Sequence, residues 1–161
     1  QKKDILIWTG GVKGPAIFRT MGLEISSKDS LIVDEHLRVK ESSGTIFAIG
    51  DNAIYINPRT QTPVVWNVPA AQEEAKIVAI NILRAIAGKL MIPFTPWKKY
   101  PFVLAVGKKY AIAYLIVFRF WGLSGWIAKQ LIELRYVLSM LALRKAISFW
   151  WRSVFVSRAN D

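Results

Sequence analysis

The chain has 161 residues, which is long enough to bury a core and corresponds to one or two small domains. It has no cysteine, which excludes disulfides, thiolate metal sites and a redox-active dithiol. Residues 1–88 hold ten Lys and Arg against nine Asp and Glu, whereas residues 89–161 hold twelve against two, with five of the seven tryptophans. This basic, tryptophan-rich half indicates an anionic partner, either a membrane surface or a nucleic acid.

The predicted elements of the first half are mostly short. We expect a strand at 5–8, one or two helical turns at 16–23, two short strands around a turn at Asp34–Glu35 within 31–40, and a strand at 45–49. The first residue is Gln1, and the chain opens directly into the strand-like run, so we expect a piece of a longer protein.

The strand at 45–49 ends in Gly50 and Asp51. A continuous apolar strand predicts burial on both faces, as in a parallel sheet covered by helices, and ligands bind beyond the carboxyl ends of such strands. Gly50 would let the backbone approach a ligand closely, and Asp51 could accept a hydrogen bond from a sugar or ribityl hydroxyl. A turn that simply ends the strand explains the same two residues.

The longest predicted helix runs from Pro69 to Gly88, with Asn67 as its N-cap. Glu73 and Glu74 lie in its first two turns, where the helix dipole favours acids. An ordinary surface helix with a solvated Gln72 is one interpretation of this segment.

The second half begins in a proline-rich junction, and we place the boundary between the halves after residue 92, giving domains 1–92 and 93–161. Residues 102–117 are expected to form two strands folded at Gly107–Lys108, and the pattern becomes helical from Leu123, with a break near Leu143. The longest uninterrupted apolar run is 111–118, far short of the roughly 18 to 20 residues of a spanning helix.

The helical tail has apolar and indole groups at helical spacing with Lys and Arg beside them, which is typical of an interfacial amphipathic helix. Leucine, isoleucine and valine dominate it, which favours an anionic lipid surface over nucleic acid. A helix pair that packs against other domains or a second copy is the third interpretation. The residues assigned to membrane attachment are Trp126, Lys129, Arg144, Lys145, Trp150, Trp151 and Arg152.

Three segments taken in order, 4–14, 31–53 and 68–82, resemble the C-terminal half of the flavoproteins that have two dinucleotide-binding domains. The segment "PAAQEEA" after Val68 resembles the Pro-Thr-Ala-Gln segment of type II NADH dehydrogenases, with Ala70 in place of the usual threonine. The fold class expected from this resemblance is α/β, or α+β for a fragment. It comprises the C-terminal portion of an FAD-binding Rossmann-like domain, a β-hairpin and an amphipathic, membrane-anchoring helical region.

The resemblance implies an FAD-dependent enzyme that passes electrons from NADH to a quinone. Gly50 and Asp51 would contact the ribityl and pyrophosphate part of FAD, Ala70 and Ala71 would begin the helix beside the flavin, and Ala71 with Gln72 would line the quinone pocket. Free N–H groups at that helix N-terminus could stabilise negative charge on the reduced flavin. The resemblance also implies a peripheral membrane protein, which we expect on the cytoplasmic face of a prokaryotic cell membrane.

Both glycine-rich G-x-G-x-x-G turns are missing, so we expect the chain alone to bind FAD poorly and to be inactive. Sulfide:quinone oxidoreductases, another quinone-reducing subfamily, need reactive cysteines, so they stay an alternative only if the rest of the protein supplies all of them. Disulfide reductases need a histidine beyond His36, which this chain lacks. The alternative from another class is a non-enzymatic membrane-binding or assembly module with a degenerate flavoprotein fold. We also expect self-association, as a homodimer or a segment-exchanged arrangement.

His36 is the only histidine and lies in a polar turn, so it is interpreted as a solvated surface residue. No second histidine or cysteine is present to complete a metal site, and no metal is expected.

Overall fold

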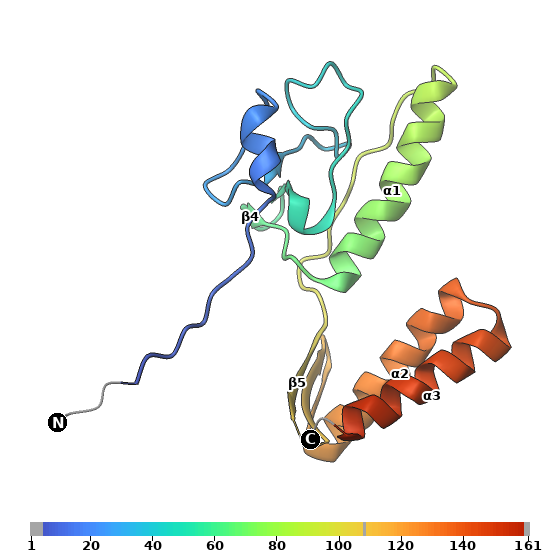
Figure 1. The fold of residues 1–161 in the computed structure, drawn as a ribbon. Coiled ribbons are helices and arrows are strands. Elements are labelled where there is room, and N and C mark those ends of the chain that lie inside the picture. The colour runs from blue at the N-terminus through green and yellow to red at the C-terminus, as the bar shows by residue number, and fades with distance from the viewer. Residues whose placement is uncertain (1–4, 108, 160–161) are drawn as a thin grey trace. The chain divides into compact units, whose positions relative to one another are not determined.

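The computed structural model describes residues 5–107 and 109–159, and the chain divides into two compact units, Gln1–Lys98 and Lys99–Asp161 (Figure 1). Residues 93–98 pack with the first unit. Phe94 is buried there and its N–H donates to the Glu35 carbonyl at 2.7 Å, and the Asn57 amide donates to the Trp97 carbonyl at 3.0 Å. The division therefore falls after Lys98, a few residues beyond the predicted boundary.

The first unit contains two 3₁₀ turns, four short strands and one long helix. They are η1 (Ala16–Thr20), β1 (Leu31–Ile32), η2 (Gly50–Asn52), β2 (Ala53–Ile54), β3 (Ile56–Asn57), β4 (Thr62–Pro63) and α1 (Val68–Ile86). β1 pairs with β2 in parallel, and β3 pairs with β4 antiparallel. Helices and strands are both present, which is consistent with the α+β description. The expected parallel sheet is limited to the two-residue pair β1–β2 among the described residues.

Two predicted strands of this unit are wrong. Residues 5–8 form no strand, and their side chains are 79–89% exposed, because no described segment pairs with them. Residues 45–49 make only a single bridge, between Phe47 and Arg38. An apolar run becomes a regular strand only where a neighbour completes its hydrogen-bond ladder, and local sequence does not supply that neighbour. The turn predicted at Asp34–Glu35 is confirmed, with a bridge between Val33 and Val39 closing it.

Helix α1 is confirmed together with its N-cap. The Asn67 side chain accepts a hydrogen bond from the Ala70 N–H at 3.0 Å, and Pro69 lies in the first turn. The buried positions recur three or four residues apart along one side of the helix, and they are Ala70, Glu74, Val78 and Asn81. We call this set the buried stripe of α1.

The second unit is a three-stranded antiparallel sheet followed by two helices. The elements are β5 (Phe102–Gly107), β6 (Tyr110–Leu115), β7 (Phe118–Trp121), α2 (Gly122–Met140) and α3 (Leu143–Ala159). The predicted strand pair and the break before Leu143 are confirmed, whereas β7 is an additional strand. Lys108, the second residue of the predicted fold-back, lies outside the described residues.

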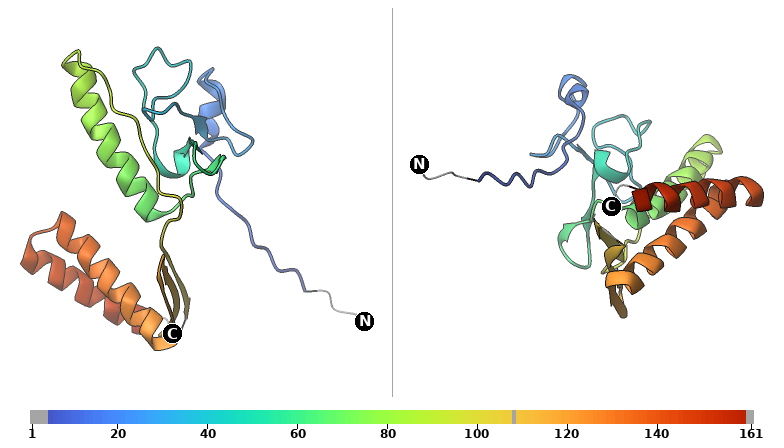
Figure 2. Two further views of the ribbon diagram at one scale, coloured as in Figure 1. Left: turned by 180° about the vertical axis from the view of Figure 1, so that it is seen from behind. Right: turned by 60° about the horizontal axis from the view of Figure 1, so that its bottom comes forward.

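Helix α2 contacts β6 closely and lies beside α3 (Figure 2). A Cβ atom at Gly125 would lie 2.1 Å from the Ala111 carbonyl oxygen, so a larger residue there would force the helix away from the strand. Ala111, Ala113 and Ala146 are fully buried, and such small side chains let the elements of this unit approach one another. None of the described helices is both long enough and apolar enough to span a membrane.

Candidate functional site

The Gly50–Asp51 turn is held by two hydrogen bonds from outside it. Gly50 has φ +59°, in the left-handed region that favours glycine, and its N–H donates to Glu74 Oε2 at 2.7 Å. The buried hydroxyl of Ser30 donates to the Asp51 carbonyl at 3.3 Å. Asp51 itself is exposed. The turn therefore fixes its backbone inward and leaves the Asp51 carboxylate facing outward.

The predicted flavin-facing residues of α1 lie beside this turn. A Cβ atom at Gly50 would be 3.5 Å from the Ala71 Cβ, an ordinary van der Waals contact. Ala70 is buried, Ala71 is half-buried and Gln72 is exposed. The structure thus brings together the two segments that the sequence analysis assigned to one site, although they are some twenty residues apart along the chain.

The N–H groups expected to be free at the start of α1 are in use. The Ala70 N–H donates to the Asn67 side chain, and the Ala71 N–H donates to the Asn67 carbonyl at 3.0 Å. Pro69 has no N–H to offer. Direct donation from Ala70 or Ala71 is therefore not available in this structure, and the positive end of the helix dipole is what remains to interact with an anion.

Glu74 is the residue of this site that the sequence analysis missed. It is only 5% exposed, and burial raises its pKa to about 7; the Gly50 N–H acts in the opposite direction, and the charge of Asp51 adds to the rise. A signal for it existed: Glu74 is four residues from both Ala70 and Val78, so it belongs to the buried stripe of α1 rather than to a solvated first turn.

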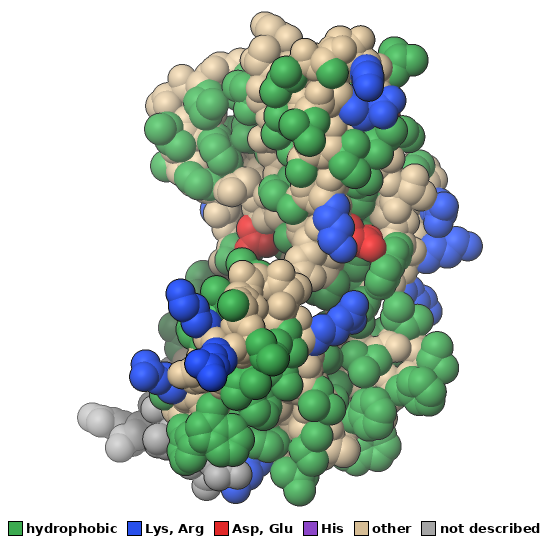
Figure 3. All heavy atoms as spheres, turned by 90° about the vertical axis from the view of Figure 1, so that its right-hand side faces the viewer, with side chains coloured by type: hydrophobic (Ala, Val, Ile, Leu, Met, Phe, Trp, Pro, Cys, Tyr) green, Lys and Arg blue, Asp and Glu red, His purple; other side chains and the backbone are tan. Residues whose placement is uncertain are grey.

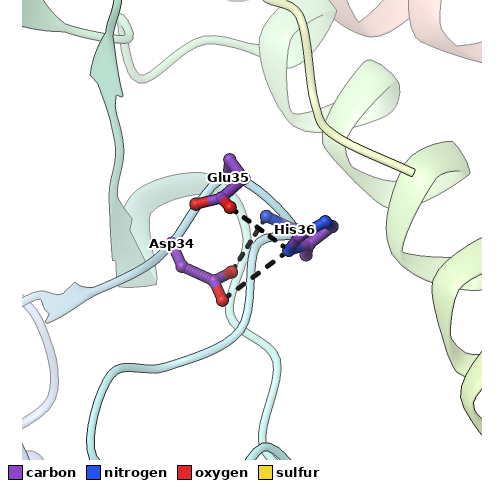
Figure 4. A group of neighbouring side chains, drawn as sticks. All are labelled: Asp34, Glu35 and His36. Atoms are coloured by element: carbon purple, nitrogen blue, oxygen red, sulfur yellow. Dashed lines mark hydrogen bonds and ion pairs between the residues drawn. The ribbon is translucent and has the colours of Figure 1, made fainter. Parts of the chain in front are cut away.

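His36 is not the fully solvated residue that was predicted. Its side chain is 21% exposed, and Nδ1 lies 3.8 Å from carboxylate oxygens of both Asp34 and Glu35 (Figure 4). The three side chains could each offer a ligand atom to a metal ion. However, Asp34 Oδ1 already accepts the N–H groups of His36 and Arg38, and Oδ2 accepts from the Arg38 guanidinium at 2.8 Å.

Through these hydrogen bonds the Asp34 carboxylate stabilises a tight turn. Burial alone would raise the pKa of Asp34, but hydrogen bonds from the Arg38 N–H and guanidinium and from the His36 N–H outweigh it and hold that pKa below its usual value. The cluster is thus accounted for by turn formation.

A second candidate surface lies on α3. Leu141 and α3 surround a hollow of about 380 Å³ whose lining combines three basic side chains with apolar ones; its residues are Leu141, Arg144, Lys145, Ser148, Phe149 and Arg152. We call Arg144, Lys145 and Arg152 the basic cluster of α3. In Figure 3, Lys and Arg side chains lie among hydrophobic ones over the part of the second unit that faces the viewer.

The other residues assigned to membrane attachment have mixed surroundings. Trp151 is exposed and contacts the half-buried Trp150 and the exposed Phe155, with ring centroids 5.8 and 5.5 Å away. The Trp150 indole N–H donates to the Gln130 carbonyl at 2.8 Å, so this ring also joins α3 to α2. Lys129 forms an ion pair with Glu133 along α2, and the half-buried Trp126 lies on the same helix.

A comparison with known proteins indicates the general class of protein to which the chain is related. The chain is similar in sequence to part of an NADH dehydrogenase, which at the coarse level supports an oxidoreductase fragment. The particular relative is a protein of Dictyostelium discoideum named "Probable NADH dehydrogenase", 28% identical over 162 residues. The match covers 96% of this chain and 33% of the relative, so the chain spans about a third of the length of the curated protein that it matches.

The other two comparisons add little. No protein-family model matches the chain. The structure described as "Crystal structure of Fdr9" superposes on 62% of this chain and 30% of its own, with a TM-score of 0.39 and 22% sequence identity. That TM-score does not establish a common fold.

Proposed function

We propose that the chain is the C-terminal part of an FAD-dependent NADH:quinone oxidoreductase. The observation that carries the proposal is the similarity to an NADH dehydrogenase along almost the whole chain. The contact between the Gly50–Asp51 turn and the start of α1 supports the proposal, because a cofactor site formed by both segments requires them to lie side by side.

The described residues fit part of an FAD site. The outward Asp51 carboxylate can accept a hydrogen bond from a hydroxyl of the ribityl or ribose portion. The left-handed Gly50 leaves no side chain between the turn and α1. The positive end of the α1 dipole favours negative charge nearby, although the Ala70 and Ala71 N–H groups are already bonded.

Bound FAD would supply the hydride-accepting and electron-donating chemistry, with NADH as the substrate that reduces it. This chain's own residues would bind and orient the cofactor. Gln72 is exposed next to Ala71 and offers an uncharged amide that can donate to a quinone carbonyl.

We further propose that the second unit attaches the protein to a membrane surface that contains anionic lipid. Among the described residues of this unit Glu133 is the only acid, and it forms an ion pair with Lys129 on α2. Exposed Phe149 and Trp151 lie on the same helix and can enter the apolar boundary of a bilayer. This surface also supports the second candidate function, a membrane-binding or assembly module without enzymatic activity.

The test of the enzymatic proposal uses the full-length protein. We expect purified protein to retain about one FAD per chain and to oxidise NADH only when a soluble quinone analogue is present. The Asp51→Ala variant should lose FAD affinity by about tenfold, as expected for loss of a charge-assisted hydrogen bond. Wild-type protein without flavin or NADH oxidation would instead support the membrane-binding module.

A further inference from the structure

The buried stripe of α1 contains two polar side chains, and each one holds backbone from another part of the first unit. Asn81 is fully buried; its amide donates to the His36 and Ile92 carbonyls at 3.2 and 2.9 Å and accepts the Ile92 N–H at 2.8 Å. Asn81 therefore joins α1 to the backbone at His36 and Ile92. Glu74, two turns earlier, makes the corresponding contact with the Gly50–Asp51 turn.

The contact of Glu74 controls the direction of the turn. Its Oε2 accepts the Gly50 N–H at 2.7 Å, and the backbone of Gly50 is in the left-handed region. Because a peptide unit is planar, holding this N–H toward α1 fixes the plane of the Ile49–Gly50 peptide, and the left-handed φ of Gly50 then directs the chain toward the next residue. That residue is Asp51, whose carboxylate is exposed on the outer side of the turn.

A carboxyl group at the buried position 74 is energetically unfavourable in itself. Burying it carries a desolvation penalty, and the nearby Asp51 carboxylate makes its ionised form less favourable still. An apolar side chain of similar length would fill the same space without that penalty, but it could not accept the half-buried Gly50 N–H, which would then lose this partner. The acceptor atom is therefore the property of Glu74 that the turn requires.

We propose that Glu74 is a positioning residue for the cofactor: by accepting the Gly50 N–H it aims the Asp51 carboxylate at a sugar-type hydroxyl of the bound dinucleotide. This inference rests on the proposed FAD function. Glu74 itself acts through Asp51 and is not assigned a contact with the cofactor.

The experiment measures FAD affinity of the full-length protein by flavin fluorescence after removal and re-addition of FAD. Glu74→Gln keeps an acceptor oxygen at the same distance, and its affinity should stay within about threefold of wild type. Glu74→Met keeps length and volume without an acceptor, and affinity should fall about tenfold. Val78→Ala, on the same buried stripe, is the control: it should lower thermal stability and leave FAD affinity unchanged.

A double-mutant cycle separates positioning from general destabilisation. In an Asp51→Ala background, Glu74→Met should change FAD affinity by less than about twofold, because the group that it positions is gone. Independent, multiplying losses in the double variant would overturn the inference. If Glu74→Met does not accumulate as folded protein, Glu74→Asp replaces it, since the shortened carboxylate cannot reach Gly50 and should show the same pattern.

The outcomes also distinguish the inference from the function on which it rests. Wild-type protein that binds no FAD overturns the proposed function and this inference with it. Wild-type protein that binds FAD, with Glu74→Met binding equally well, overturns only the role of Glu74.

Discussion

At the scale of single residues, Glu74 is a buried carboxyl group near the start of α1 that accepts a hydrogen bond from the backbone of Gly50. Its place near the start of α1 suits an acid that interacts with the helix dipole in solvent. Packing instead places it among Ala70 and Val78, where it is 5% exposed and bonded to Gly50. The same carboxyl group is therefore both a structural acceptor and a titrating group.

The raised pKa of Glu74 predicts a specific pH dependence of stability. The ordinary pKa is 4.5 and burial raises it to about 7, so in the window between these values the folded chain holds a proton that the unfolded chain has released. The free energy of unfolding should therefore fall as pH rises from about 4.5 to 7, by roughly 1 to 3 kcal/mol. Glu74→Gln cannot titrate, so its advantage over wild type should grow across this window.

Urea unfolding of wild type and Glu74→Gln at pH 5 and pH 8 measures this difference. Gln72→Ala, an exposed change in the same helix that adds and removes no charge, is the control and should follow the wild-type pH dependence. Parallel curves for wild type and Glu74→Gln would show that the carboxyl group does not titrate in this window.

At the scale of elements, the hairpin between β6 and β7 contains a strained residue. The two strands are joined by Ile116 and Val117, and Ile116 has φ +67°. A β-branched residue in the left-handed region is an outlier, since its side chain crowds the backbone there. Two-residue hairpin turns with positive φ at the first position normally use glycine.

Replacing this residue should stabilise the second unit. We expect Ile116→Gly to raise the free energy of unfolding by about 0.5–1 kcal/mol, as strain is relieved and partly offset by the greater freedom of glycine in the unfolded chain. Val117→Gly is the matched control and should destabilise, because Val117 is not among the positive-φ residues. Thermal unfolding of the intact protein gives the comparison, and a lower midpoint for Ile116→Gly would contradict the assignment of strain.

At the scale of the whole molecule, nearly all of the net positive charge lies in the second half of the chain, which has few acidic residues. Residues 89–161 hold twelve of the 22 Lys and Arg residues and only two of the 11 Asp and Glu residues. Long-range attraction to a negative surface depends on such an excess and is screened by salt. The position of the cluster on α3 makes the contribution of individual residues testable.

Vesicle flotation tests membrane attachment of the full-length protein. We expect flotation with vesicles that contain anionic phospholipid at low salt and loss of flotation with neutral vesicles. The triple variant Arg144→Gln, Lys145→Gln, Arg152→Gln should bind anionic vesicles at least about tenfold more weakly, since each basic group contributes about 1 kcal/mol near such a surface.

The matched control removes three exposed basic residues of the first unit, Lys40→Gln, Arg59→Gln and Lys76→Gln, and should float like wild type. If both triple variants bind equally weakly, net charge rather than the basic cluster of α3 determines binding. If wild type does not float at low salt, helices α2 and α3 serve protein packing instead.

Features that depend on neighbouring residues could be predicted from the amino-acid sequence alone. Asn67 and Pro69 start α1, because capping and proline geometry act within one turn. The β5–β6 pair and the break before Leu143 also follow from local periodicity and turns.

Features that depend on contacts between residues distant in the chain could not be predicted in this way and are seen only in the folded protein. Residues 5–8 have no partner among the described segments, and residues 45–49 form a single bridge with Arg38 instead of a ladder, and no pattern within those segments reveals this. The bond between Glu74 and Gly50, 24 residues apart, likewise arises from packing. Burial turns a polar side chain toward whichever backbone group can satisfy it, and the fold selects that group.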